Sequence, residues 1–200
     1  TLVEPDAAAR EKSQQVVSDE LNRRIAEGLY DASQASSVQT RMTYTEDLAR
    51  GVTSADLVIE AIPERLDLKR ALFTQLDALT QPDTILATNS SSIKISAIES
   101  ATGRQDKVLN MHFYGMIWDR PMVELMRGSA TSEATIESVY RCAQRIDVTP
   151  LVVDKESTGF IFNRVWRAIK RETLHLVNDG VTSHENVDRA WMIFTGMKLG

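Results

Sequence analysis

An almost unbroken apolar run at 55–62, A-D-L-V-I-E-A-I, constrains the fold of this 200-residue chain more than any other segment. Its inner residues are nearly all apolar, which is typical of a parallel strand covered on both faces. Pro63 ends the run, and four leucines follow at helical spacing: Leu68, Leu72, Leu76 and Leu79. Such a stripe indicates a helix packed on a sheet. The two segments predict a strand and its crossover helix.

The same alternation continues along the chain. Strands are expected at 1–4, 42–45, 55–62, 84–88, 108–112, 122–125 and 151–153. Helices are expected from Asp6, a good N-cap, to about Ala26, and at about 131–146, whereas 31–37 is interpreted as a polar connector. Alternating strands and helices predict an α/β fold with a doubly wound parallel sheet.

The pattern changes after Ser157. Two helices, at 159–177 and from Ser183 to Phe194, follow one another without a strand between them. We therefore expect two domains: residues 1–155 form the sheet domain, and residues 156–200 begin an all-helical domain.

Composition narrows the class of protein. The chain has 42% hydrophobic and 26% charged residues and a net charge of −5, as in soluble globular proteins, and no polybasic patch for nucleic acid or a membrane. No apolar run approaches the length of a membrane-spanning helix. Cys142 is the only cysteine, which suits a reducing compartment, so a cytoplasmic location is expected. We assign no metal ligands.

The candidate chemistry lies between 89 and 124. A serine cluster, N-S-S-S, follows one strand at 89–92, while His112 and Glu124 lie in two further apolar runs. A carboxylate beside an imidazole fixes its tautomer and supports its charged form, so the pair can move a proton. Spacing alone leaves open whether His112 is a satisfied core histidine and Glu124 a strand-edge charge.

Five segments together resemble the L-3-hydroxyacyl-CoA dehydrogenase family, which includes the hydroxybutyryl-CoA, gulonate and diketo-ester enzymes. They are D-L-V-I-E-A-I-P-E-x-L-x-L-K (56–69), A-T-N-S-S-S (87–92), H-F (112–113), V-E-L (123–125) and G-F-I-x-N-R (159–164). The resemblance covers essentially the whole chain. It implies a Rossmann-type sheet, an NAD-dependent oxidoreductase of fatty-acid metabolism, a small-molecule 3-hydroxyacyl substrate and a homodimer formed through the helical domain.

The resemblance also implies roles for individual residues. His112 is similar to the family's general acid/base and Glu124 to its partner, while Ser91 and Asn163 are similar to the groups that hold the substrate oxygen and the histidine. On the cofactor side, Glu4 corresponds to the acid that binds the adenosine ribose, which favours NAD over NADP. The remaining cofactor-side positions are Ala61, Ile62, Glu64, Lys69 and Asn89, with Ser91 again.

The chain departs from the family in its phosphate-binding motif. The 200 residues contain no G-x-G-x-x-G, and no strand to stand between those at 1–4 and 55–62. We therefore expect a fragment truncated at both ends, whose first strand is absent. An inactive truncated remnant with a structural role is the alternative to an enzyme.

Two further departures concern the pocket. Gly115 stands where the family has an Asn near the nicotinamide; Tyr114 and Trp118 are either pocket-wall or packing residues. Ser13 matches a family position near CoA, but Glu20 stands where a Lys is expected. A carboxylate there would repel phosphate, so a relative that oxidises a carrier-free 3-hydroxy acid or ester is the alternative substrate class.

Overall fold

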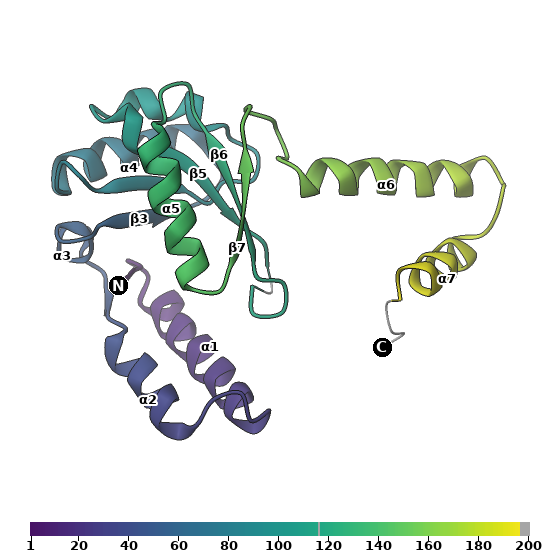
Figure 1. The fold of residues 1–200 in the computed structure, drawn as a ribbon, viewed down its shortest axis with the longest axis horizontal. Coiled ribbons are helices and arrows are strands. Elements are labelled where there is room, and N and C mark those ends of the chain that lie inside the picture. Colours follow the sequence, from purple (N-terminus) through teal and green to yellow (C-terminus); the bar gives the residue numbers. More distant parts are fainter. Residues whose placement is uncertain (116, 197–200) are drawn as a thin grey trace.

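The computed structural model describes residues 1–115 and 117–196 (Figure 1). Met116 of the segment after His112, and the final Gly200, lie outside the described residues. The main sheet has five strands in the order β3-β4-β5-β6-β7. Their bounds are β3 Leu57–Glu60, β4 Ile85–Thr88, β5 Val108–Phe113, β6 Met122–Arg127 and β7 Thr149–Val153.

The strand directions confirm a mainly parallel sheet with one exception. β3, β4 and β5 are parallel neighbours, and β6 is parallel to β7, but β5 and β6 are antiparallel. The connection between β5 and β6 spans 114–121, which is too short for a crossover between parallel strands. This return places the C-terminal end of β5 beside the start of β6.

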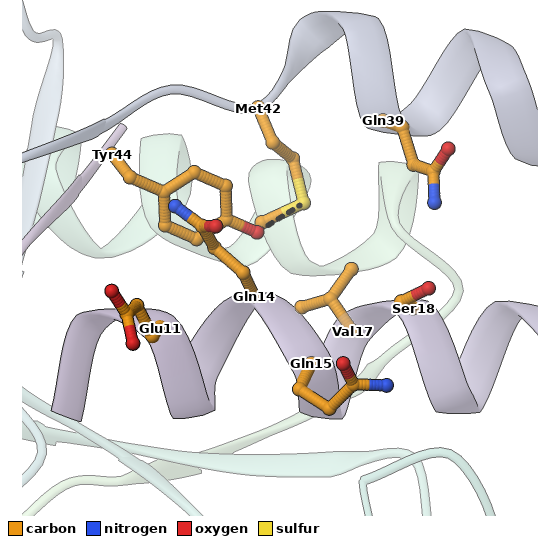
Figure 2. Close-up of a pocket in the computed structure, with 8 residues that line it drawn as sticks. All are labelled: Glu11, Gln14, Gln15, Val17, Ser18, Gln39, Met42 and Tyr44. Atoms are coloured by element: carbon orange, nitrogen blue, oxygen red, sulfur yellow. Dashed lines mark hydrogen bonds between the residues drawn. The ribbon is translucent and has the colours of Figure 1, made fainter. Parts of the chain in front are cut away.

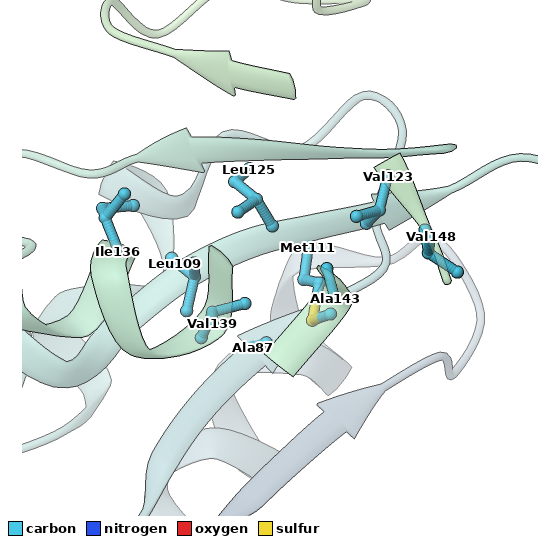
Figure 3. Packing of buried hydrophobic residues seen from close by; sticks show 9 residues of the cluster. All are labelled: Ala87, Leu109, Met111, Val123, Leu125, Ile136, Val139, Ala143 and Val148. Atoms are coloured by element: carbon cyan, nitrogen blue, oxygen red, sulfur yellow. The ribbon is translucent and has the colours of Figure 1, made fainter. Parts of the chain in front are cut away.

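Helices cover both faces of this sheet. α5 (Glu133–Arg145) lies across one face, where Ile136, Val139 and Ala143 pack on Leu109 and Leu125 (Figure 3). On the other face lie α3 (Leu48–Val52), α4 (Leu66–Leu79) and η1 (Ile95–Ala97). The short 3-10 turns η2 (Glu99–Ala101) and η3 (Gln105–Lys107) complete the path to β5. The core is thus two layers of side chains around β4 and β5.

The N-terminal part forms a second, smaller sheet. β1 (Leu2–Val3) pairs in parallel with β2 (Tyr44–Thr45), and among the described strands none joins this pair to β3. α1 (Ala7–Ala26) begins after the Asp6 cap, as expected. The separation agrees with the expected gap between the strands at 1–4 and 55–62.

The connector expected at 31–37 is wrong, because this segment belongs to helix α2 (Ala32–Arg41). Asp31 caps the helix and accepts a hydrogen bond from the Gln34 N–H at 2.8 Å, while the Gln34 side chain bonds back to Asp31 N–H at 2.9 Å. This capping box satisfies two otherwise unpaired backbone donors. The capping pattern Asp-x-x-Gln therefore predicts the start of a helix better than the polar composition predicts a connector.

The C-terminal helices extend away from the sheet (Figure 1). They are α6 (Phe162–Asn178) and α7 (His184–Thr195), and none of their described residues is fully buried. Several large apolar side chains on them are exposed, among them Val165, Leu174 and Ile193. In the described part of the chain, no helix combines the length and apolarity needed to cross a membrane.

Candidate active site

His112 and Glu124 are brought together by the antiparallel pairing of β5 and β6. The register places them directly opposite each other, and cross-strand neighbours on one face lie within side-chain reach. His112 Nδ1 lies 3.3 Å from Glu124 Oε2, and both side chains are buried. The structure therefore brings these two predicted residues into contact, while their catalytic roles stay a prediction.

The Glu124 carboxylate has four neighbouring donors. Its Oε1 accepts hydrogen bonds from the backbone N–H groups of Ile161 and Phe162, each at 2.9 Å, and its Oε2 from the Tyr114 hydroxyl at 2.7 Å, beside His112. Burial raises the pKa of Glu124, but the bonds from His112, Phe162, Tyr114 and Ile161 outweigh burial and lower the pKa overall. The carboxylate stays ionised next to the imidazole and caps the start of α6.

Tyr114 is a site residue whose role the sequence left open. Burial raises the pKa of its phenol, and the hydrogen bond to Glu124 and the charge of that carboxylate raise it further. The hydroxyl therefore remains a donor over the ordinary pH range. The signal was present in the sequence, because residues two apart on an extended strand face the same side, and Tyr114 follows His112 by two.

The segment entering α6 closes the other side of the histidine. Phe160 is buried and stacks on the His112 ring with centroids 4.9 Å apart. Gly159 and Phe160 both have left-handed backbones, with φ of 84° and 52°. This conformation costs a side-chain-bearing residue about 1–2 kcal/mol, and the stacking and the amide bonds of the next two residues to Glu124 hold it in place.

The other two predicted catalytic residues, Ser91 and Asn163, make no direct hydrogen bond to His112 or Glu124 among the described contacts. Ser91 is exposed in the 89–93 loop after β4. Asn163 stands in the first turn of α6, directly after Phe162. Asn89 accepts a hydrogen bond from Phe113 N–H at 2.7 Å, so it ties the serine loop to the end of β5.

Lys69 lies inside the protein. It is 1% exposed, and its Nζ contacts Glu60 Oε1 at 2.6 Å, the Ile62 carbonyl at 3.0 Å and Glu64 Oε2 at 3.3 Å. The Ile62 N–H donates to Glu60 at 2.6 Å. Lys69 and the backbone of Ile62, both expected on the cofactor side, thus bond within the protein, and they shape the turn that carries Ala61.

Glu64 connects this turn to the serine loop. Its Oε1 accepts bonds from the hydroxyls of Ser90 and Ser92 and from the N–H groups of Ser92 and Ile93. Burial acts to raise the pKa of Glu64, but the serine bonds and the Lys69 charge lower it to about 2. The carboxyl ends of β3 and β4 are thereby locked together.

The predicted positions at the N-terminal end have local partners. Glu4 accepts a hydrogen bond from Asp6 N–H at 2.9 Å at the entrance to α1. Glu20 is paired with Arg23 at 2.6 Å and with Arg24 at 3.0 Å. Glu20 thus has two cationic partners on its own helix, at i+3 and i+4, and Arg23 also pairs with Glu27 at 2.7 Å. That a carboxylate at this position repels phosphate stays a prediction.

A groove of about 530 Å³ lies elsewhere, between α1, the end of α2 and β2 (Figure 2). Its lining is mostly uncharged, with Gln14, Gln15, Ser18, Gln39 and Tyr44 among the residues. None of the lining residues is a candidate catalytic or cofactor residue. The groove is therefore separate from the predicted site at the β5–β6 return.

Comparison with known families agrees with this geometry. Residues 1–157 match the family model described as 3-hydroxyacyl-CoA dehydrogenase, NAD binding domain. The chain belongs to the 3-hydroxyacyl-CoA dehydrogenase family. Residues 159–200 match the model described as the C-terminal domain of the same dehydrogenase. The resemblance found in the sequence motifs is confirmed.

Relatives in the family differ in substrate. The chain is 37% identical over 158 residues to L-carnitine dehydrogenase of Bacillus cereus, covering 79% of this chain and 48% of the relative. It is 33% identical to 3-hydroxybutyryl-CoA dehydrogenase of Clostridioides difficile, covering 96% of this chain and 66% of the relative. The chain thus spans about half to two thirds of the length of these curated relatives.

Solved structures support the same fold. A diketoreductase structure superposes with a TM-score of 0.90 at 32% identity, covering 99% of this chain and 70% of the other. The (S)-3-hydroxybutyryl-CoA dehydrogenase of Ralstonia eutropha gives a TM-score of 0.91 at 29% identity, covering 99% and 69%. The α/β sheet followed by helices is therefore the family fold.

Proposed function

We propose that the whole protein is an NAD-dependent 3-hydroxyacyl-CoA dehydrogenase. The observation that carries the proposal is the buried contact of 3.3 Å between His112 Nδ1 and Glu124 Oε2. Family membership makes a dehydrogenase the expected activity, and this pair supplies the proton transfer that oxidation of an alcohol requires.

His112 acts as the general base in the oxidative direction and as the general acid in reduction. Its Nδ1 faces the ionised Glu124, which fixes the tautomer and leaves Nε2 to take the proton of the 3-hydroxyl group. Ser91 and Asn163 orient the substrate oxygen. Bound NAD would supply the hydride acceptor for the carbon that carries this hydroxyl group.

The carboxyl ends of β3, β4 and β5 suit the nicotinamide half of this cofactor. These parallel neighbours bring the turn at 61–64, the loop at 89–93 and His112 to one edge, where doubly wound sheets bind their ligands. Ala61, Asn89 and Ser91 would line that half and Glu4 would bind the adenosine ribose. Lys69, Glu64 and the Ile62 backbone would hold the turn in place. A glycine-rich phosphate cradle is not encoded in the 200 residues.

The substrate carrier is the part of the proposal with a second candidate. A carrier-free 3-hydroxy substrate is favoured by the Glu20 position and by the similarity to L-carnitine dehydrogenases. The arginines that pair with Glu20 do not leave a net positive charge there, because Arg23 also pairs with Glu27 and Asp119. The deciding experiment compares kcat/KM of the whole protein for 3-hydroxybutyryl-CoA and for a short 3-hydroxy ester.

With Glu20 in place of a lysine, we expect the two substrates to differ by less than about a hundredfold, which is about 2.7 kcal/mol of transition-state binding. A larger preference for the thioester would show that CoA recognition is intact. Absence of NAD-dependent turnover with either substrate would favour the structural remnant over the enzyme.

The proposal extends to organisation and location. We place the NAD-binding domain at 1–155 and the start of a helical substrate and dimerisation domain at 156–200. The exposed apolar side chains of α6 and α7 support a homodimer through the helical domain. The single cysteine supports a reducing, cytoplasmic location, and the 3-hydroxyacyl substrate supports a place in fatty-acid metabolism.

A further inference from the structure

Glu124 Oε2, the oxygen that faces the catalytic histidine, also accepts a hydrogen bond from Tyr114. The Tyr114 hydroxyl lies 2.7 Å from Oε2, whereas His112 Nδ1 lies 3.3 Å from the same atom. A hydrogen bond from a hydroxyl to a carboxylate is at full strength near the first distance, and an N–H···O bond is weak at the second. The Tyr114 hydroxyl is therefore the stronger of the two hydrogen-bond donors to Oε2.

The tyrosine ring is fixed so that the hydroxyl cannot easily turn away. It meets the His112 ring edge-on with centroids 4.5 Å apart and the Phe162 ring with centroids 5.1 Å apart. The other carboxylate oxygen is held by the first amides of α6. With three donors besides the histidine, the carboxylate is held away from its closest approach to the imidazole.

We propose that Tyr114 is a positioning residue that limits how strongly Glu124 engages His112. Its hydroxyl binds Oε2, so the hydrogen bond between Oε2 and His112 Nδ1 stays long. This inference rests on the proposed function, since it concerns the same pair. Removing the hydroxyl while keeping the ring should let Oε2 close on Nδ1, because the edge-on packing of residue 114 does not need the oxygen.

The test follows the His112 Nδ1–H proton by NMR in the whole protein with ¹⁵N-labelled histidine. The signal is assigned by its loss in His112→Gln. In Tyr114→Phe the resonance should move downfield, and its exchange with water should slow by about threefold to tenfold, the range that one net hydrogen bond contributes. Tyr44→Phe is the matched control, because Tyr44 is half-buried and its hydroxyl contacts Met42 in the distant groove.

A second pair of variants shows whether the effect passes through the carboxylate. The double variant Glu124→Gln/Tyr114→Phe should show the His112 resonance at the same chemical shift as Glu124→Gln alone. A His112 resonance that is unchanged or moves upfield in Tyr114→Phe, or a shift that persists without Glu124, would overturn the proposal. The readout needs no turnover, so it is separate from the test of the dehydrogenase function.

Discussion

At the scale of single residues, hydrogen bonding outweighs burial at both acidic positions near the candidate site. Glu124 and Glu64 are each surrounded by backbone and hydroxyl donors, and the pKa of each carboxyl group is lowered although burial opposes this. Donors to the ionised form favour that form. Acid should therefore weaken the site by protonating carboxylates that the fold keeps charged.

Glu64 offers a direct test of this linkage. Because its folded-state pKa is depressed to about 2, its contribution to stability is present above the unfolded-state pKa and is lost as the pH falls through the folded value. We expect the urea midpoint of the parent to fall on acidification towards pH 2 more steeply than that of Glu64→Gln. Ser92→Ala keeps the charge of Glu64 and removes one hydroxyl donor, so the pH dependence of its urea midpoint should be intermediate. The same pH dependence in all three proteins would contradict the assignment.

Some of these residue contacts could be predicted from the sequence and others could not. The family resemblance implied that His112 and Glu124 are partners, whereas the spacing of their two apolar runs alone left this open. The amides of Ile161 and Phe162 reach Glu124 from 37 and 38 residues away, and no local pattern encodes that distance. Lys69 was placed on the cofactor side by the family resemblance alone. A lysine is rarely buried unless it is paired, and only the folded chain reveals its partner Glu60.

At the scale of elements, the first turn after β3 depends on a buried ion pair. Lys69 of α4 and Glu60 of β3 have side chains that are 1% and 0% exposed. Their bonds also fix the Ile62 backbone and reach Glu64. The position of the candidate cofactor edge therefore depends on how α4 packs against β3.

Breaking this pair should be costly. Lys69→Met leaves the Glu60 charge buried and should lower the free energy of unfolding by about 3–5 kcal/mol, measured by chemical denaturation. Lys107→Met is the matched control, because it removes an exposed pair with Asp83 and should cost no more than about 1 kcal/mol. A loss in Lys69→Met as small as in Lys107→Met would show that the buried pair is not required.

Local signals also explain where the expected elements were right or wrong. The apolar stripe predicted α4, and Asp6 predicted the start of α1. The segment at 31–37 was interpreted as a connector because of its polar composition, although Asp31 and Gln34 form a capping box. The antiparallel return from β5 to β6 follows from its short connection, which the alternating pattern alone did not reveal.

At the scale of the whole molecule, the described chain forms two separate sheets. β1 and β2 pair with each other and β3 to β7 form the other sheet, so one edge of β3 lacks a neighbouring strand within the described residues. Unpaired strand edges favour association between molecules. The binding elements on β1 and β3 are consequently not held in one continuous sheet.

This arrangement predicts weak cofactor binding by residues 1–200 prepared alone. Dinucleotides are held mainly by backbone amides at a glycine-rich turn and a helix N-terminus, and the chain has no such turn. We expect a dissociation constant for NADH weaker than about millimolar, measured by calorimetric titration, together with aggregation. Adding a strand-turn-helix with G-x-G-x-x-G ahead of Thr1 should restore both solubility and binding; micromolar affinity without it would contradict this prediction.

The central claim is that His112, supported by Glu124, transfers the proton in an NAD-dependent oxidation. The most direct measurement compares turnover and NADH affinity of His112→Gln with those of the parent in the whole protein, with His175→Gln on the exposed side of α6 as control. We predict a kcat lower by about 10²–10⁴ in His112→Gln, because general acid–base catalysis contributes that factor. The dissociation constant for NADH should stay nearly unchanged, and His175→Gln should behave like the parent. Turnover of His112→Gln within about threefold of the parent, far below the loss expected for a general base, would contradict the claim.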